Sequence, residues 1–155
     1  MTESIGEINN FKKLVKAVGG LKIKQPIFVK MANEITPAFS FELIAVSLKN
    51  GIRGFIFSNL VKNRNNSGLD RGELANFNNL KGNFSGKPTE ENANNLIKNA
   101  RKKFGKEIAI IGCGGVFSAE DAKAKFDAGA DLVQLITGMI YQGPQLAGEI
   151  CIELT

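Results

Sequence analysis

Four short apolar segments, each followed by a helical pattern, constrain the fold more than any other feature of the sequence. They are "PIFVKMA" (26–32), "GFIFSN" (54–59), "EIAIIG" (107–112) and "LVQLITG" (132–138). Nearly continuous apolar runs of this length are typical of parallel strands that are covered on both faces. Strands that alternate with helices predict a parallel sheet with right-handed crossovers, so we expect an α/β fold.

Capping residues between these segments support the alternation. Residues that favour helix starts are Thr36 with Pro37, Thr89, Ser118 with Asp121, and Pro144. Apolar residues at helical spacing also predict a leading helix within residues 1–20, before the first strand.

Two architectures contain such a sheet: an open, doubly wound sheet and part of a (β/α)8 barrel. The C-terminal ends of the four segments carry polar residues and glycines, namely Lys30, Ser58, Asn59, Gly114, Gly115, Thr137 and Gly138. That end of a barrel carries the active site, and the loops after its last two strands form a phosphate site. A GxGxxG dinucleotide fingerprint is absent from the sequence. We therefore predict one partial barrel domain over residues 1–155, with a leading helix (1–20) and four βα units (26–155).

Composition excludes several kinds of chemistry. The chain has no histidine and two cysteines, Cys113 and Cys151, so Ser-His-Asp and Cys-His catalysis are excluded within it and we expect no metal site. We interpret both cysteines as structural, since Cys113 has no basic neighbour and Cys151 lies on an apolar helix face. The net charge is +5, but the lysines are scattered without an RNA-binding motif, so we expect no nucleic-acid partner. No apolar run approaches the roughly 20 residues that cross a bilayer, and we expect a cytoplasmic location.

Six motifs identify a family resemblance. In order they are "PIFVKMA", "GIRGFIFSN", "FSGKPT", "IIGCGG", "AGADLVQLITG" and "YQGPQL". Together they resemble the C-terminal half of class 2, quinone-dependent dihydroorotate dehydrogenases, over about residues 25–154. The resemblance implies a half-barrel that binds FMN and takes part in the oxidation of dihydroorotate to orotate in pyrimidine biosynthesis.

The resemblance also implies roles at the ends of the first two strands. Lys30 stands where a lysine contacts the flavin ring, and Ser58 where a threonine usually touches the cofactor. Asn59 matches the asparagine that hydrogen-bonds the pyrimidine, and Leu60 occupies a position that contacts the substrate. A cation at Lys30 would stabilise the negative charge that develops when the ring accepts hydride. The alternative for Lys30 is a lysine that only extends into solvent from a strand end.

The other implied flavin positions are Gly86, Gly114, Gly115, Ile136, Thr137 and Gly138. Of these, the resemblance implies that Gly115, Ile136 and Thr137 present backbone N–H groups or a hydroxyl to the FMN phosphate. Glycines let backbone N–H groups approach an anion closely at a helix start. A tight βα turn without a ligand is the alternative for the glycine pair.

The sequence departs from the family pattern at several positions. Leu60 replaces a threonine and cannot donate its hydrogen bond, and Ile136 replaces a tyrosine. Gly82 and Asn83 stand where paired glycines are usual. The loop 61–81 is rich in asparagine, and we interpret it either as an active-site lid or as the product of drift. These changes affect the expected substrate site more than the flavin site.

A complete barrel needs about 250 residues, so this sequence has room for four of its eight strands. The resemblance implies that the other half supplies the serine base, and we assign no catalytic residue here. Four strands in an open row would leave two unpaired edges. We therefore expect a partner, either the N-terminal half of the barrel or a second copy of this chain. The quinone would be reached only through that other half, which would place the complete protein at the inner face of the cell membrane.

Three functions stay open at this point. The first is a fragment or split subunit of dihydroorotate dehydrogenase. The second is a half-barrel that binds flavin or phosphate without catalysis, and the third is a degenerate, truncated product.

Overall fold

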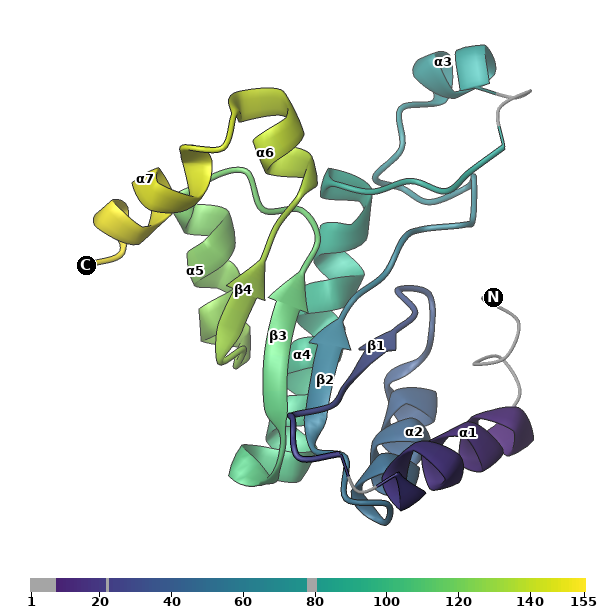
Figure 1. Ribbon diagram of the computed structural model, residues 1–155. Coiled ribbons are helices and arrows are strands. Elements are labelled where there is room, and N and C mark those ends of the chain that lie inside the picture. Colours follow the sequence, from purple (N-terminus) through teal and green to yellow (C-terminus); the bar gives the residue numbers. More distant parts are fainter. Residues whose placement is uncertain (1–7, 22, 78–80) are drawn as a thin grey trace.

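The computed structural model describes residues 8–21, 23–77 and 81–155, and its centre is a parallel sheet (Figure 1). The four strands are β1 (Phe28–Met31), β2 (Gly54–Phe57), β3 (Ala109–Cys113) and β4 (Leu132–Gln134), in the order β1-β2-β3-β4. All three strand pairs are parallel. A doubly wound sheet reverses direction from an inner strand, whereas this sheet adds each strand beside the previous one. The predicted α/β fold with a parallel sheet is confirmed.

Helices connect the strands and flank the sheet. The α-helices are α1 (Ile8–Gly20), α2 (Pro37–Leu48), α3 (Arg71–Leu74), α4 (Glu90–Phe104), α5 (Ala119–Ala128), α6 (Thr137–Gln142) and α7 (Leu146–Glu153). Short 3-10 turns cover Ala75–Phe77, Lys87–Thr89 and Gly105–Glu107. Within the described residues, the predicted leading helix (1–20) corresponds to α1, whose Phe11 and Val15 are buried, and residues 1–7 of the prediction lie outside them. No described helix is long and apolar enough to cross a membrane.

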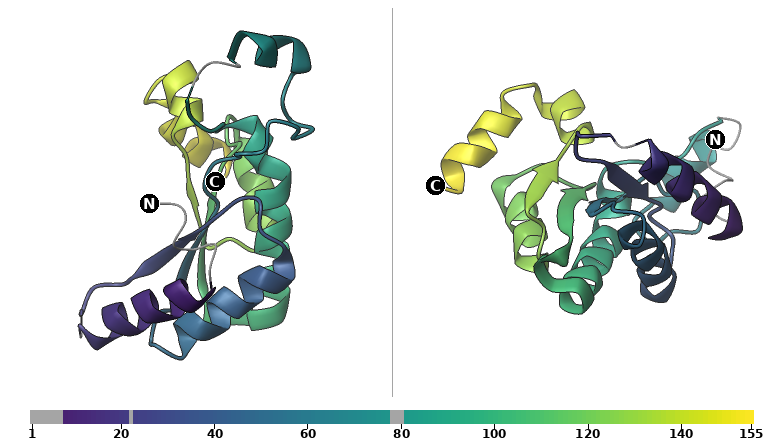
Figure 2. Two further views of the ribbon diagram at one scale, coloured as in Figure 1. Left: turned by 90° about the vertical axis from the view of Figure 1, so that its right-hand side faces the viewer. Right: turned by 60° about the horizontal axis from the view of Figure 1, so that its bottom comes forward.

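Helices α2, α4 and α5 cover one face of the sheet, with α4 in the middle (Figure 2). Phe55, Phe57 and Ile110 are fully buried on that face and form the core with these helices. Complete burial of such a side chain stabilises the fold by about 1.5–3 kcal/mol. The core therefore lies between the sheet and one helical layer.

The opposite face of the sheet carries a row of residues that the strand register aligns. Lys30 pairs with Ile56, Ile56 with Ile111, and Ile111 with Leu132. Leu132 is 60% exposed and Lys30 is exposed. The expectation of strands covered on both faces is therefore wrong for the described residues. The apolar pattern of these strands is the one that a barrel interior requires.

Two local expectations are also wrong. The fourth strand was expected to run over 132–138, but β4 ends at Gln134 because its pairing partner β3 ends at Cys113. Cys151 is exposed on α7, so its assignment to a structural position is not supported, whereas Cys113 is buried. Thr36 and Ser118 cap α2 and α5 through their side chains as predicted. Thr89 precedes α4 but makes no side-chain cap.

Candidate cofactor site

A pocket opens at the C-terminal ends of the strands. Its lining consists of Lys30, Ser58, Asn59, Leu60, Ser85, Gly86, Thr89, Cys113, Gly114, Gly115, Val116, Leu135, Ile136, Thr137 and Gly138. All of the positions that the resemblance assigns to flavin or substrate are in this lining. Their individual roles stay predictions, but residues from four strand ends and from the segment before α4 come together as expected.

The ends of β1 and β2 contribute a cation, a hydroxyl and an amide. Lys30 is the one charged residue of the described pocket lining, and it is exposed at the open side. Ser58 is 2% exposed and follows a cis peptide bond after Phe57, while Asn59 is half-buried and its N–H donates to the carbonyl of Met31. Leu60 is 39% exposed. The polar groups are therefore held at the sheet end, and the apolar Leu60 lies toward solvent.

Gly114 and Gly115 follow β3 and form a tight turn in the pocket lining. Their φ angles are +104° and +78°, a region that side-chain-bearing residues rarely adopt. A Cβ on Gly114 would overlap the hydroxyl of Thr89, and one on Gly115 would lie 2.9 Å from Cγ of Glu90. Outside the strand ladder, in which Cys113 pairs with Gln134, the N–H groups of these two glycines have no hydrogen-bond acceptor among the described residues. Backbone N–H groups in a tight turn form a concavity suited to an anion.

The loops after β3 and β4 meet the segment before α4. The hydroxyl of Thr137 donates to Ser85 Oγ at 3.0 Å, and a Cβ on Gly86 would lie 3.1 Å from Cγ2 of Thr137. Thr137 and Gly138 begin α6, where the first N–H groups of a helix lack partners within it. These contacts bring a second set of backbone donors to the same end of the pocket.

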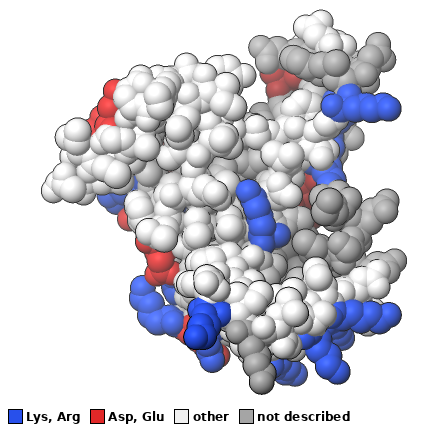
Figure 3. Space-filling view, viewed as in Figure 1, with Lys and Arg blue, Asp and Glu red and all other residues white. Residues whose placement is uncertain are grey.

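Positive side chains do not create this anion site. In Figure 3, Lys and Arg gather mainly in the lower part of the view, with a few in the middle and at the upper right, whereas the upper-left region of α6 and α7 shows acidic atoms at its edge and no basic cluster. Backbone N–H groups, rather than a cluster of cations, therefore provide the capacity of the pocket to bind an anion.

Asn33 was not among the predicted site residues, although its hydrogen bonds hold parts of the pocket lining together. Its side chain is fully buried, and its Nδ2 donates to Ser58 Oγ at 2.6 Å and to the carbonyl of Thr89 at 2.8 Å. Thr89 in turn donates its hydroxyl to the carbonyl of Gly86 at 2.7 Å. Oδ1 of Asn33 has no hydrogen-bond partner among the residues that the structure describes. A polar residue after an apolar strand was the available signal, but the sequence did not show that it would be buried.

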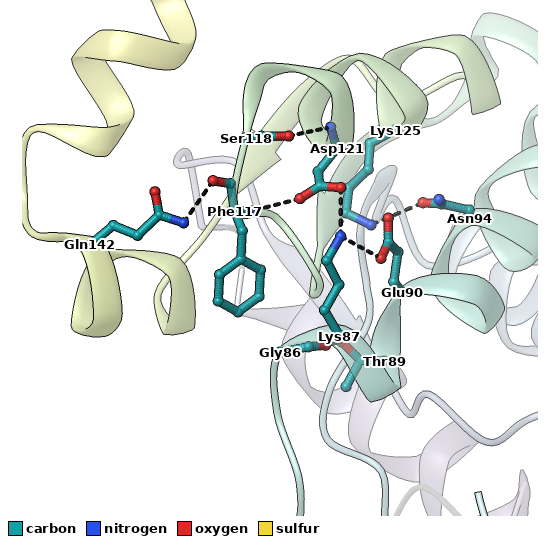
Figure 4. A network of polar contacts seen from close by, with 10 residues as sticks. All are labelled: Gly86, Lys87, Thr89, Glu90, Asn94, Phe117, Ser118, Asp121, Lys125 and Gln142. Carbon is teal, nitrogen blue, oxygen red and sulfur yellow. Dashed lines mark hydrogen bonds and ion pairs between the residues drawn. The ribbon is translucent and has the colours of Figure 1, made fainter. Parts of the chain in front are cut away.

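A second set of missed residues forms a charged network behind the glycine turn (Figure 4). Lys87 Nζ lies 2.9 Å from Glu90 Oε2 and 2.6 Å from Asp121 Oδ1, and so joins the starts of α4 and α5. Burial alone would lower the pKa of Lys87, but its hydrogen bonds to Asp121 and Glu90 raise it above the usual value. Burial alone would raise the pKa of Asp121, and the bonds from Lys87 and the Phe117 N–H lower it.

The same network holds the loop after β3 in place. Asp121 accepts the Phe117 N–H at 2.8 Å, and Gln142 of α6 donates to the Phe117 carbonyl at 2.9 Å. Ser118 Oγ accepts the Asp121 N–H and so caps α5, while the carboxylate of Asp121 accepts the N–H of Phe117, one residue before the cap. The network therefore ties α4, α5 and α6 together around the pocket.

The pocket residues fit a flavin mononucleotide. The backbone N–H groups of the Gly114–Gly115 turn suit its phosphate, because phosphates are bound by backbone N–H groups at helix starts and turns. Lys30 and Ser58 provide a cation and a hydroxyl at the strand ends. Asn59 carries an amide that can both donate and accept.

Comparison with known proteins gives consistent results. The family model described as "Dihydroorotate dehydrogenase" matches residues 3–155. A dihydroorotate dehydrogenase (quinone) of Brucella ovis is 41% identical over 128 residues, which are 83% of this chain and 34% of that protein. The corresponding protein of Mesorhizobium japonicum is 40% identical over 148 residues, 96% of this chain and 39% of that protein. The chain thus spans between a third and two fifths of the length of these curated relatives.

Two solved structures from Eimeria tenella are also similar. DHODH in complex with ferulenol matches with a TM-score of 0.69 and 29% identity, covering 82% of this chain and 32% of that one. A ligand-free type of DHODH matches with a TM-score of 0.79 and 24% identity, covering 94% and 44% of the two chains. The second likeness supports the fold alone. Together with the sheet order, these matches confirm the prediction of βα units from a (β/α)8 barrel.

Proposed function

We propose, since the chain belongs to the dihydroorotate dehydrogenase family, that it binds FMN and forms the cofactor-binding part of an enzyme that oxidises dihydroorotate to orotate in pyrimidine biosynthesis. One observation carries the proposal: the positions that the resemblance assigns to flavin and substrate all line one pocket. The relatives' names include a quinone, so we propose a quinone as the electron acceptor of the complete enzyme.

In this proposal, some pocket residues bind the phosphate of FMN and others contact its ring. Backbone N–H groups or the hydroxyl of Gly115, Ile136 and Thr137 bind the phosphate, and Gly86, Gly114 and Gly138 lie beside them in the pocket lining. Ser58 and Lys30 contact the ring. When bound, FMN supplies an acceptor for the hydride of the substrate. Lys30 stabilises negative charge on the ring, because a fixed cation placed where charge develops lowers the barrier.

The substrate side of the pocket depends on Asn59. Its amide can pair with a donor and an acceptor of a pyrimidine ring, and Leu60 adds an apolar contact without a hydrogen bond. We assign no general base within the chain, and we propose that the serine base comes from the other half of the barrel. The chain itself then positions cofactor and substrate.

A partner follows from the open face of the sheet. β1 and β4 are its edges, and Leu132 on the open face is 60% exposed. Unpaired edges and exposed apolar rows favour association with another chain. We propose that the N-terminal half of a barrel, or a second copy of this chain, covers this face, and that the quinone is reached through that other half. The expected location is the cytoplasm, at the inner face of the cell membrane for the complete enzyme.

Titration of the purified 155-residue chain with FMN tests the proposal. Binding is followed by quenching of flavin fluorescence and by the visible spectrum. Lys30→Ala should weaken FMN binding, because it removes the one cation of the described lining. Lys98→Ala, at an exposed position on α4, is the matched control and should leave the affinity unchanged. If the chain does not bind FMN, or if both variants bind it equally, the assignment is wrong.

A flavin- or phosphate-binding half-barrel without catalysis is the second candidate. It is favoured by the lining of the pocket, which contains no carboxylate or histidine among the described residues. Dihydroorotate should then fail to bleach the bound flavin even after a complementary half-barrel is added. A cooperative thermal transition of the chain alone would contradict the third reading, a degenerate product that does not fold.

A further inference from the structure

Lys125 is a buried cation for which the proposed function has no use so far. It lies on α5 and is 0% exposed, and its Nζ donates to Asn94 Oδ1 on α4 at 2.9 Å. Its stem packs on the last part of β3, where a Cβ on Gly112 would lie 2.8 Å from its Cδ. The side chain therefore runs directly behind the strand that leads into the Gly114–Gly115 turn.

The carboxylates of Glu90 and Asp121 also lie behind the Gly114–Gly115 turn. Glu90 is packed behind Gly115, and Asp121 begins α5; Lys87 bridges both at 2.9 and 2.6 Å. Burial lowers the pKa of Lys125 below its usual value, while the charges of Glu90, the Cys113 thiol and Asp121 act in the opposite direction and favour the charged ammonium. Two ammonium groups and two carboxylates give +2 − 2 = 0 behind the turn. Without Lys125 the sum would be +1 − 2 = −1, next to the place where an anion binds.

We propose that Lys125 is a positioning residue that balances the charge behind the Gly114–Gly115 turn and so lets the turn accept a phosphate dianion. The inference rests on the proposed function and deepens it, because it states which end of the pocket binds the charged phosphate of the ligand. A phosphate monoester carries about −1.5 to −2 charge at pH 7. Repulsion from an uncompensated carboxylate in a low-dielectric site is stronger than in water.

Lys125→Met tests this, because methionine keeps the apolar stem and removes the charge. FMN and riboflavin, which lacks the phosphate, are titrated in parallel. The variant should bind FMN about tenfold more weakly, which corresponds to about 1.4 kcal/mol, and riboflavin within twofold of the unchanged chain. Lys123→Met on the same helix is the control: its side chain is 62% exposed, and both affinities should stay unchanged.

A second substitution separates charge from packing. Glu90→Gln in the Lys125→Met background restores the sum to +1 − 1 = 0 and should recover most of the FMN affinity. Glu90→Gln alone should tighten FMN several-fold and leave riboflavin unchanged, and this variant stays informative even if Lys125→Met fails to fold. Equal losses for FMN and riboflavin, or no recovery in the double variant, would overturn the proposal and leave Lys125 a packing residue.

Inorganic phosphate distinguishes failure of this inference from failure of the proposed function. Phosphate binding that weakens in Lys125→Met, without binding of either flavin, would support the charge balance and refute the flavin assignment. If the unchanged chain binds neither flavin nor phosphate, both are refuted. If it binds FMN and Lys125→Met keeps the ratio of FMN to riboflavin affinity, the flavin assignment stands and the role of Lys125 is refuted.

Discussion

Substitution of Gly115 measures how closely Glu90 packs behind the Gly114–Gly115 turn. The φ of Gly115 is +78°, and a Cβ there would lie 2.9 Å from Cγ and 3.1 Å from Cα of Glu90, with Cβ of Glu90 closer still. Cα and Cβ of Glu90 belong to the first turn of α4 and therefore cannot rotate away from the added Cβ. Gly115→Ala therefore introduces both an unfavourable backbone conformation and a steric overlap.

The two contributions can be estimated separately. An alanine in the left-handed region costs about 1–2 kcal/mol, and overpacking a filled site costs about 1–3 kcal/mol more. We expect Gly115→Ala to lower the free energy of unfolding by about 2–5 kcal/mol. Because typical domains have about 5–15 kcal/mol in total, this is a large share of the stability.

Two other glycines provide matched controls. Gly51 has nearly the same φ, +79°, but a Cβ there meets nothing within 4 Å, so Gly51→Ala carries the backbone cost alone. Gly148 lies within α7 with open space around it, and Gly148→Ala should stabilise the chain by about 0.5–1 kcal/mol. The difference between Gly115→Ala and Gly51→Ala isolates the steric term.

Urea unfolding of the three variants at one protein concentration measures these differences. A fixed concentration matters because self-association would shift the apparent stability. The slope with urea should stay constant, since a changed slope signals a change in the unfolded or native ensemble. If Gly115→Ala loses no more stability than Gly51→Ala, the close packing of Glu90 behind the turn does not exist in solution.

Two further predictions concern buried and paired polar groups. Asn33→Ala removes the donor to Ser58 Oγ and the Thr89 carbonyl and should cost about 1–3 kcal/mol in urea unfolding, since buried groups are left unsatisfied; a change below about 0.5 kcal/mol would contradict the buried bonds. Burial alone would raise the pKa of Asp131, but bonds from the Ile110 N–H and Arg101 hold it below the usual value. A carboxyl whose pKa is lower in the folded state stabilises the fold above its unfolded pKa of about 3.9, and this stability is lost as the pH falls through the folded pKa. Asp131→Asn should therefore reduce stability at pH 7 and flatten its decline below about pH 4 in thermal melts; an unchanged acid profile would refute the linkage.

The sheet and the pocket were largely predictable because both follow from local patterns and one topological rule. Parallel strands in sequence order bring their C-terminal ends to one side, so Lys30, Ser58, Gly114 and Thr137 could be assigned to one rim from their positions in the sequence alone. Their roles toward flavin came from the resemblance and stay predictions. The location of the pocket required only strand order.

Residues whose surroundings depend on tertiary packing were missed. Lys125 follows Ala124 on a helix and has the residue type of an exposed position, yet α5 packs it against Gly112 and α4 supplies Asn94. Threonine is a residue type that often caps helices, but the hydroxyl of Thr89 donates to the Gly86 carbonyl instead. Such outcomes depend on neighbours far away in the sequence, which no local pattern contains.

The two ends of the pocket differ in how completely this chain builds them. On the phosphate side, the bonds Thr137 to Ser85 and Thr89 to Gly86 connect the loops to one another, and Lys87 links the helices behind them. On the substrate side, Leu60 is 39% exposed, and the sheet face beyond it lacks a covering layer among the described residues. The donors for an anion are therefore positioned by contacts within the chain, whereas the side of the pocket at Leu60 is open to water. Because exclusion of water strengthens electrostatic interactions in a site, the proposed function assigns cofactor binding to this chain and efficient oxidation of a substrate to its complex with the proposed partner on the open face.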